Sequence, residues 1–183
     1  MAARRRREKF ATGDETSRPP LRPLNDRQKE FLEALKTSPQ VIVMGPAGTG
    51  KTYISASYAA DLYRTHAIHK IILTRPNVPG GRSLGHFPGT IDEKMAHWVI
   101  PFTTVLEQRL GKGVYDTGVR NKNIEIVPFE TMRGRSFEHA FVILDEAQNT
   151  TPLEMKMFLT RHGEGSRVVI NGDVRQSDLR SRS

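Results

Sequence analysis

Hydrophobic positions along the chain follow two patterns, short continuous apolar runs and longer stretches in which apolar residues recur at helical spacing. The continuous runs are rich in β-branched residues and predict five strands covered on both faces, at residues 41–44, 71–74, 124–127, 141–144 and 168–170. The helical spacing predicts helices at residues 26–36, 52–64 and 91–110, and from 151 to near Gly163. Strands that alternate with helices predict an α/β fold, a mainly parallel sheet with helices on both faces.

Individual residues refine these helices. One apolar stripe marks the helix at 52–64 and consists of Ile54, Tyr58 and Leu62. Pro101 is expected to divide the 91–110 segment into two helices, because proline lacks the N–H that a helix interior needs. The last helix begins with the residues of a capping box, with proline in its first turn: Thr151, Pro152 and Glu154.

Composition indicates one folded domain. The chain has 183 residues, of which 37% are hydrophobic and 26% charged. Residues 1–24 lack hydrophobic periodicity and contain three prolines, so we expect a flexible arm there and the domain at residues 25–183. The chain has no cysteine, which excludes disulfides, thiolate metal sites and a cysteine nucleophile. Without an apolar run of membrane-spanning length or a signal-like start, a cytoplasmic location is expected.

The formal net charge of +8 is concentrated at one end. Residues 1–9 hold five basic residues and one acidic residue, so this short segment contributes half of the excess. Such a block is either a solvated arm or a segment that attaches to nucleic acid. The charge alone supports no more than weak binding to polyanions.

The clearest motif joins the first predicted strand to the helix that follows it. Residues 45–52 match G-x-x-x-x-G-K-[ST] in its strand–loop–helix context, where backbone N–H groups and the helix start face a phosphate. We expect Lys51 to reach the β- and γ-phosphate oxygens and the Thr52 hydroxyl to ligate Mg²⁺. The rest of the loop would complete the nucleotide contact: Gly45, Pro46, Ala47, Gly48, Thr49 and Gly50.

A second motif follows the strand at 141–144. Asp145 and Glu146 stand at its end, and the carboxyl ends of parallel strands form the edge at which ligands bind in α/β folds. We expect Asp145 to ligate Mg²⁺ and Glu146 to act as the general base toward water. An acidic pair of this kind can also merely flank a helix start, and the upstream phosphate loop is what favours the catalytic interpretation.

Two glutamines are further candidates. Gln176 follows the strand at 168–170 and could sense the γ-phosphate; the alternative is a polar turn. Gln28 precedes the loop by seventeen residues and could contact an adenine. Its spacing from Asn25 also fits a capping box, which would use the same side chain locally. From spacing alone the local role of Gln28 is favoured.

Taken together, these residues resemble the PhoH-like ATPases, which are related to the first RecA-like domain of superfamily 1 helicases. The resemblance covers roughly residues 22–180, and its narrower signatures are residues 87–95 and Arg133-Gly134-Arg135. It implies a single RecA-like P-loop domain that binds and hydrolyses ATP with Mg²⁺, with Gln28 on the adenine. It also implies contacts to RNA or single-stranded nucleic acid from Arg75, Arg133 and Arg135; for the last two the alternative is a solvated basic loop. The absence of an Asn-Lys-x-Asp pattern further favours ATP over GTP.

Departures from the family pattern set further expectations. Relatives usually continue with a helix, a strand and an arginine-bearing segment, so truncation at Ser183 is one interpretation; a missing strand would expose a sheet edge. Some longer relatives carry a PIN-type nuclease domain, which this sequence lacks, so no intrinsic RNase activity is expected. No second lobe supplies an arginine finger, which predicts head-to-tail assembly, and the resemblance implies a hexameric ring. The candidate fingers are Arg161, Arg175 and Arg180.

Two other functions stay open at this point. The chain could be a nucleotide-gated nucleic-acid-binding module with little turnover, or an inert fragment. Glu146 and Gln176 argue for hydrolysis, because binding alone needs no residue that polarises water.

Overall fold

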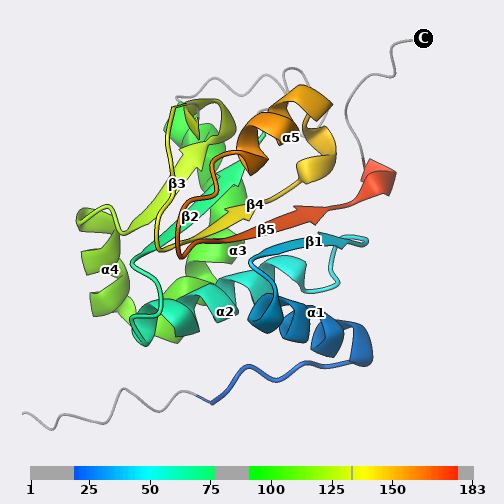
Figure 1. Cartoon of the computed structure of the whole chain (residues 1–183). Coiled ribbons are helices and arrows are strands. Elements are labelled where there is room, and N and C mark those ends of the chain that lie inside the picture. Colours follow the sequence, from blue (N-terminus) through cyan, green and yellow to red (C-terminus); the bar gives the residue numbers. More distant parts are fainter. Residues whose placement is uncertain (1–18, 77–90, 133, 177–183) are drawn as a thin grey trace, which may run out of the picture.

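The computed structural model describes residues 19–76, 91–132 and 134–176. In this part of the chain five parallel strands form one sheet (Figure 1) in the order β1-β5-β4-β2-β3. Their bounds are β1 Gln40–Met44, β2 Lys70–Arg75, β3 Ile124–Pro128, β4 Ala140–Leu144 and β5 Arg167–Gly172. Each contains one predicted strand, which confirms the α/β fold with a single RecA-like domain. Because β5 lies between β1 and β4, the loops that leave these three strands meet at one edge.

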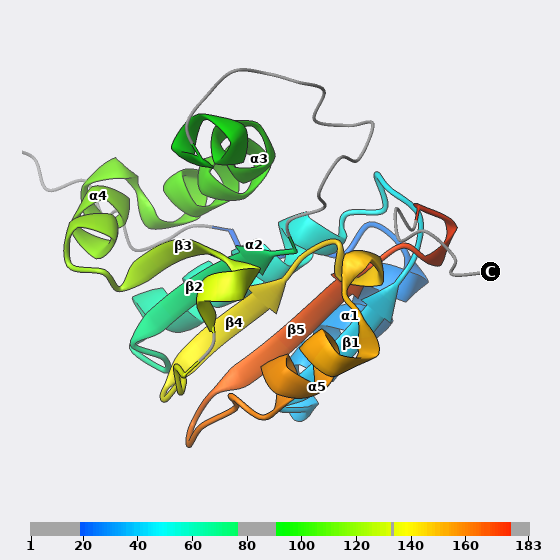
Figure 2. The same cartoon turned by 90° about the horizontal axis from the view of Figure 1, so that it is seen from above.

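Helices cover both faces of the sheet (Figure 2). They are α1 Asp26–Thr37, α2 Lys51–Arg64, α3 Ile91–Leu110, α4 Lys112–Arg120 and α5 Pro152–Leu159. Side chains alternate across each strand, so Phe141 and Ile143 face a core shared with α1, α2 and α3, whereas Val142 and Leu144 face the other side with Phe158 of α5. The continuous apolar runs are therefore explained by burial on both faces.

Helix α2 packs closely because its buried face is built from small residues. Ile54 is buried as expected, but Tyr58 and Leu62 are only partly buried. The most deeply buried positions are small: Ser55, Ala56, Ser57, Ala59 and Ala60. Short side chains allow the helix backbone to approach the sheet and α3. Arg109 of α3 adds a bidentate ion pair to Asp61, with a shortest N–O distance of 2.6 Å.

Three predictions about helices were wrong or incomplete. Pro101 does not divide the 91–110 segment, which forms one helix. Phe102 and Leu106 behind it are almost fully buried, and this burial outweighs the cost of about 3 kcal/mol that an interior proline imposes. Helix α4 was not predicted, and a single residue, Gly111 with a φ of 82°, separates it from α3. Helix α5 ends at Leu159 rather than near Gly163, although its capping box is present.

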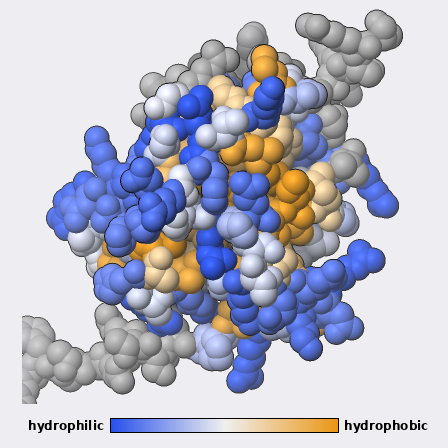
Figure 3. All heavy atoms as spheres, viewed as in Figure 1, coloured by the Kyte–Doolittle hydropathy of each residue, from blue (hydrophilic) through white to orange (hydrophobic). Residues whose placement is uncertain are grey.

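Two further features of the fold are the segment before α1 and the outer strand β1. The predicted arm is not wholly separate from the domain, since Leu21 packs against the core formed with α1 and α2. Strand β1 is an outer strand of the described sheet, and Ile42 and Met44 are 64% and 46% exposed on the face of the sheet on which α5 packs. Hydrophobic residues are correspondingly visible at the surface over the sheet and α5 in Figure 3. No helix in the described part of the chain is long and apolar enough to span a membrane.

Candidate functional site

The glycine loop runs from the end of β1 to the start of α2. Gly48 and Gly50 have φ values of 76° and 85°, a left-handed conformation that costs other residues free energy. Gly50 caps α2 without a side-chain hydrogen bond, so the first N–H groups of the helix have no side-chain cap. The N–H of Gly45 donates to the Gly172 carbonyl at 3.0 Å and ties the loop to the end of β5.

Two side chains stabilise the curve of this loop. The Lys51 ammonium donates to the carbonyls of Gly45 and Pro46 at 2.5 and 2.8 Å. The Thr49 hydroxyl donates to the Pro46 carbonyl at 2.9 Å. The Lys51 ammonium is therefore held against the loop carbonyls, where anionic oxygens would compete with these neutral acceptors for its N–H groups. Charge-assisted bonds of that kind are the stronger ones.

Asp145 leaves the end of β4 and faces the start of α2. Its carboxylate Oδ1 lies 3.4 Å from the Thr52 hydroxyl, and its N–H donates to the Thr74 carbonyl of β2 at 2.9 Å. Burial raises the pKa of Asp145 above its ordinary value, and the neighbouring Glu146 carboxylate raises it further. Arg75 and the Asn171 side chain act in the opposite direction, but more weakly. A carboxylate that is destabilised in its charged form is well placed to benefit from a cation.

The chemistry of Thr52 and Asp145 fits Mg²⁺. A hydroxyl and a carboxylate are the hard oxygen donors that this ion prefers, and neighbouring ligands in its octahedral shell are about 3 Å apart. No three His, Asp or Glu side chains gather as a metal cage within the described residues. A magnesium ion here would therefore take its other ligands from water and phosphate oxygens, as it usually does in phosphoryl-transfer sites.

Glu146 has an unusual backbone conformation and a defined side-chain partner. Its φ of 53° is left-handed, which is uncommon for a residue with a side chain and turns the chain sharply after β4. Its Oε2 accepts a hydrogen bond from Gln148 Nε2 at 2.5 Å. Gln148 in turn accepts from the Asp173 N–H at 2.9 Å, and its Nε2 lies 3.4 Å from the Gln176 carbonyl. Gln148 thus connects Glu146 to the loop after β5.

These segments meet around a small cavity of about 30 Å³. Its lining combines the glycine loop, the end of β4 and the end of β5: Ala47, Lys51, Asp145, Glu146, Asn171, Gly172, Asp173 and Gln176. Residues almost one hundred positions apart in sequence are brought together by the strand order. Gln148 was not among the sequence candidates. Its only sequence signal was a polar residue two positions after the acidic pair.

Gln28 connects α1 to the same loop. Its Oε1 accepts from the Leu24 N–H at 2.8 Å, and its Nε2 donates to the Thr49 carbonyl at 3.1 Å. Only half of the expected capping box forms, because Asn25 accepts from the Gln28 N–H at 2.9 Å while the Gln28 side chain bonds to Leu24 instead. An open groove of about 780 Å³ lies beside Gln28, between α1 and the loop.

The basic candidates lie in different environments. The Arg75 guanidinium is 5.8 Å from the centre of the Trp98 ring and close enough to Asp145 to lower its pKa. Arg135 donates to both carboxylate oxygens of Glu125 at 3.0 and 2.9 Å and faces the Phe137 ring. Contacts of Arg75 and Arg135 with nucleic acid stay predictions. Arg133 lies outside the described residues.

The candidate arginine fingers also differ in their surroundings. Arg161 has a buried Nε with no hydrogen-bond partner in the described part of the chain. Arg175 is exposed, with its backbone N–H bonded to the Asp173 carboxylate at 3.0 Å. Arg180 lies outside the described residues. None of the three is singled out as the finger by these contacts.

The parallel sheet, the glycine loop after its first strand and the acidic strand end beside it place the chain among the P-loop NTPases. Comparison with known proteins makes this more specific. The model of the PhoH-like protein family matches residues 20–183, and the chain belongs to that family.

Individual relatives agree with this assignment. A PhoH-like protein of Bacillus subtilis (strain 168) is 48% identical over 152 residues, which are 83% of this chain and 48% of the relative. Protein PhoH of Escherichia coli (strain K12) is 44% identical over 162 residues, 87% of this chain and 46% of the relative. The chain thus spans about half the length of these relatives.

Proposed function

We propose that this protein binds ATP with Mg²⁺ and hydrolyses it, in an oligomeric ring and in response to RNA or another single-stranded nucleic acid. The observation that carries the proposal is the convergence of Lys51, Asp145, Glu146 and Gln176 on one cavity. A pure binding site needs the loop and the lysine. It does not need a carboxylate oriented by its own hydrogen-bond partner.

Each residue then has a chemical role. The loop N–H groups and Lys51 would bind the β- and γ-phosphates, and Thr52 and Asp145 would hold Mg²⁺, which neutralises charge on the phosphate oxygens. Glu146 would take a proton from the attacking water as its oxygen bonds to the γ-phosphorus. The bond from that phosphorus to the bridging oxygen breaks, and ADP and phosphate leave. Gln148 would orient Glu146, and Gln176 would contact the γ-phosphate.

Gln28 fits both a structural and an adenine-reading role. A glutamine amide has two N–H donors and two acceptor lone pairs, and Leu24 and Thr49 use one of each. One donor and one lone pair are therefore left, which matches the N7 acceptor and N6 donor of adenine. The groove of about 780 Å³ beside Gln28 is large enough for a nucleoside.

The proposed assembly rests on the negative charge that develops on the phosphoryl group in the transition state of hydrolysis, which an arginine finger neutralises. An arginine finger accelerates phosphoryl transfer by about 10³ to 10⁵. No arginine is among the described residues that line the cavity with Glu146. We therefore propose that a neighbouring subunit supplies it, in a head-to-tail ring for which six subunits is the expected number. Nucleic acid would contact basic residues such as Arg75 and Arg135, in a protein that we expect in the cytoplasm.

Steady-state ATP hydrolysis across protein concentrations, with and without single-stranded RNA, tests this function. We expect specific activity to rise with concentration, to respond to RNA and to be lost in Glu146→Gln. Mass measurement by light scattering with and without nucleotide tests the ring separately. Tight ATP binding with background turnover in every condition would instead support a nucleotide-gated binding module.

A further inference from the structure

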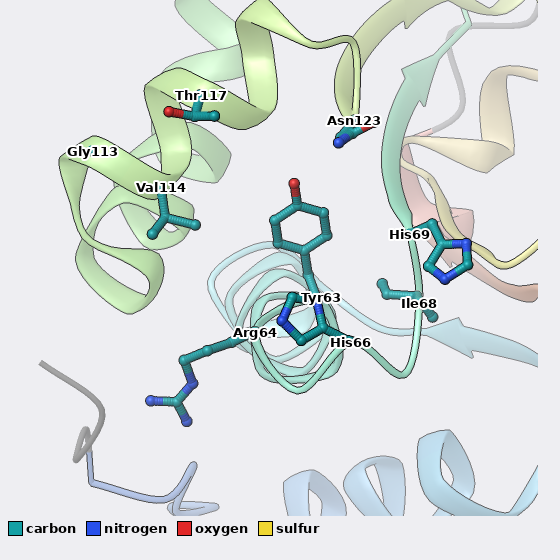
Figure 4. A pocket seen from close by; sticks show the side chains of 9 residues that line it. All are labelled: Tyr63, Arg64, His66, Ile68, His69, Gly113, Val114, Thr117 and Asn123. Carbon is teal, nitrogen blue, oxygen red and sulfur yellow. The ribbon is translucent and has the colours of Figure 1, made fainter.

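A second cavity, of about 560 Å³, lies far from the glycine loop (Figure 4). It is bordered by the end of α2, by α4 and by the starts of β2 and β3. Lys51 begins α2 and Tyr63 lies twelve residues later, so the rise of 1.5 Å per residue separates the two sites by about 18 Å. This volume is within the range of about 300 to 1,000 Å³ that small-molecule pockets occupy.

Apolar groups form part of its wall. The Tyr63 ring is partly buried and stands at the centre of the view in Figure 4. Ile68 is buried beside it, and Val114 of α4 is 47% exposed. An aromatic ring flanked by aliphatic side chains is suited to stacking a planar ring system.

Polar groups with spare hydrogen-bonding capacity border the same space. The Tyr63 hydroxyl points between Thr117 and Asn123 in Figure 4. Neither this hydroxyl nor the Asn123 side-chain amide has a hydrogen-bond partner in residues 19–76, 91–132 and 134–176. The backbone of Asn123 is nevertheless fixed, because its carbonyl accepts from Ile71 and its N–H donates to Gly118, both at 2.8 Å. Its side-chain amide, with both donor and acceptor capacity, thus starts from a fixed backbone position in the cavity lining.

The polar rim of the cavity offers nitrogen donors. They come from Arg64, His66 and His69, whereas no aspartate or glutamate is among the described lining residues. Arg64 also forms an ion pair with Asp61, outside the lining, with an N–O distance of 3.7 Å, so an anion at the cavity would share this guanidinium with that carboxylate. His66 and His69 are exposed, and the His69 ring lies 5.2 Å from that of His139. An aromatic wall, an amide with donor and acceptor capacity, and a rim of arginine and histidine nitrogen donors together match a nucleotide, which combines a planar base with a phosphate.

We propose that this cavity is a second nucleotide-binding site, which holds one nucleotide unit with its base against Tyr63, its base edge at Asn123 and its phosphate toward Arg64 and His66. The unit is either a free mononucleotide or one residue of a single-stranded RNA. The site does not depend on hydrolysis at the glycine loop, so it stands even if the chain has no ATPase activity.

Gly113 offers a way to fill the cavity without disturbing the fold. It lies in α4, its φ is not left-handed, and a Cβ placed on it meets nothing within 4 Å. Gly113→Leu should therefore occupy the cavity while it improves helix propensity. Tyr63→Leu removes the ring and Tyr63→Phe keeps it. Val119→Leu, on the same helix but outside the lining, is the matched control.

Binding is measured on the full chain saturated with a non-hydrolysable ATP analogue, whose own affinity is recorded for every variant. The probes are UMP, followed by calorimetry, and a fluorescein-labelled oligouridylate, followed by anisotropy. We expect Gly113→Leu and Tyr63→Leu to raise the Kd of a probe by about tenfold or more, which is about 1.4 kcal/mol. Tyr63→Phe should stay within about threefold of the wild type, since a ring still stacks.

The two probes separate the sources of the ligand. Variant-sensitive binding of UMP supports a free mononucleotide, and variant-sensitive binding of the oligonucleotide alone supports RNA. The proposal is overturned if neither probe binds the wild type, if both cavity variants bind like Val119→Leu, or if every variant loses affinity equally. Unchanged affinity for the ATP analogue separates this result from any failure at the glycine loop.

Discussion

Replacement of Gln28 by alanine tests whether this residue reads adenine or only holds α1 to the glycine loop. The change removes the acceptor for the Leu24 N–H and the donor to the Thr49 carbonyl. It also removes the remaining N–H and lone pair, which we expect to contact adenine. The two roles predict different outcomes for stability and for nucleotide choice.

The expected loss of stability is small. A hydrogen bond contributes about 0.5 to 1.5 kcal/mol net, and both of these bonds are exposed to water, so about 1 kcal/mol is lost in total. For a domain of this size that lowers Tm by about 2 to 4 °C. The effect on base choice is larger. Guanine carries an acceptor where adenine carries the N6 donor, so a preference of about tenfold or more for ATP should fall close to one.

The assay is a competition between ATP and GTP for a fluorescent nucleotide, together with thermal unfolding. Glu30→Ala, an exposed residue of the same helix, is the control. An equal loss of affinity for ATP and GTP in Gln28→Ala would refute adenine recognition and leave only the structural role. A wild type that does not distinguish the two nucleotides would refute it as well.

Four further substitutions test the site and the packing behind it. Glu146→Gln should lower kcat by about 10² to 10⁴ while ATP affinity changes little, and a matching loss of affinity in titrations would contradict its role as base. Gln148→Ala should lower kcat by about tenfold or more at constant KM, since it orients Glu146; an effect confined to KM would argue against that. In EDTA, Asp145→Asn should raise Tm at pH 8. Because the pKa of Asp145 is raised in the folded state, the wild type loses stability as pH rises through that pKa. The difference in Tm between variant and wild type should therefore disappear toward pH 4. A variant that is less stable than the wild type at pH 8 would contradict the raised pKa. Gly118→Val should cost about 1 to 3 kcal/mol in urea unfolding, because its Cβ would lie 2.7 Å from Ile124 Cδ1, and unchanged stability would mean that α4 can move away from β3.

The strands were predictable because their environment leaves a simple signal. A strand buried on both faces needs apolar residues at successive positions, and each predicted run lies within an observed strand. The helices were less predictable. Apolar spacing identified α2, but Ala and Ser at its buried face carry little hydrophobic signal, although they decide how closely the helix packs. Pro101 was misjudged because the burial of Phe102 and Leu106, which outweighs it, depends on the tertiary structure.

The part of the site that consists of short contiguous motifs was predictable from the sequence. The loop at residues 45–52 and the Asp145–Glu146 pair each follow a strand, so a parallel sheet must bring them to the same edge. The residues that connect these motifs were not predictable in this way. Gln28 has its nearest sequence partner in Asn25, yet its side chain passes that residue and bonds to Thr49, twenty-one positions away. Gln148 bonds to Asp173, twenty-five positions away, for the same kind of reason. An amide can donate and accept at once, so it satisfies whichever backbone groups the fold leaves beside it, and spacing alone cannot identify them.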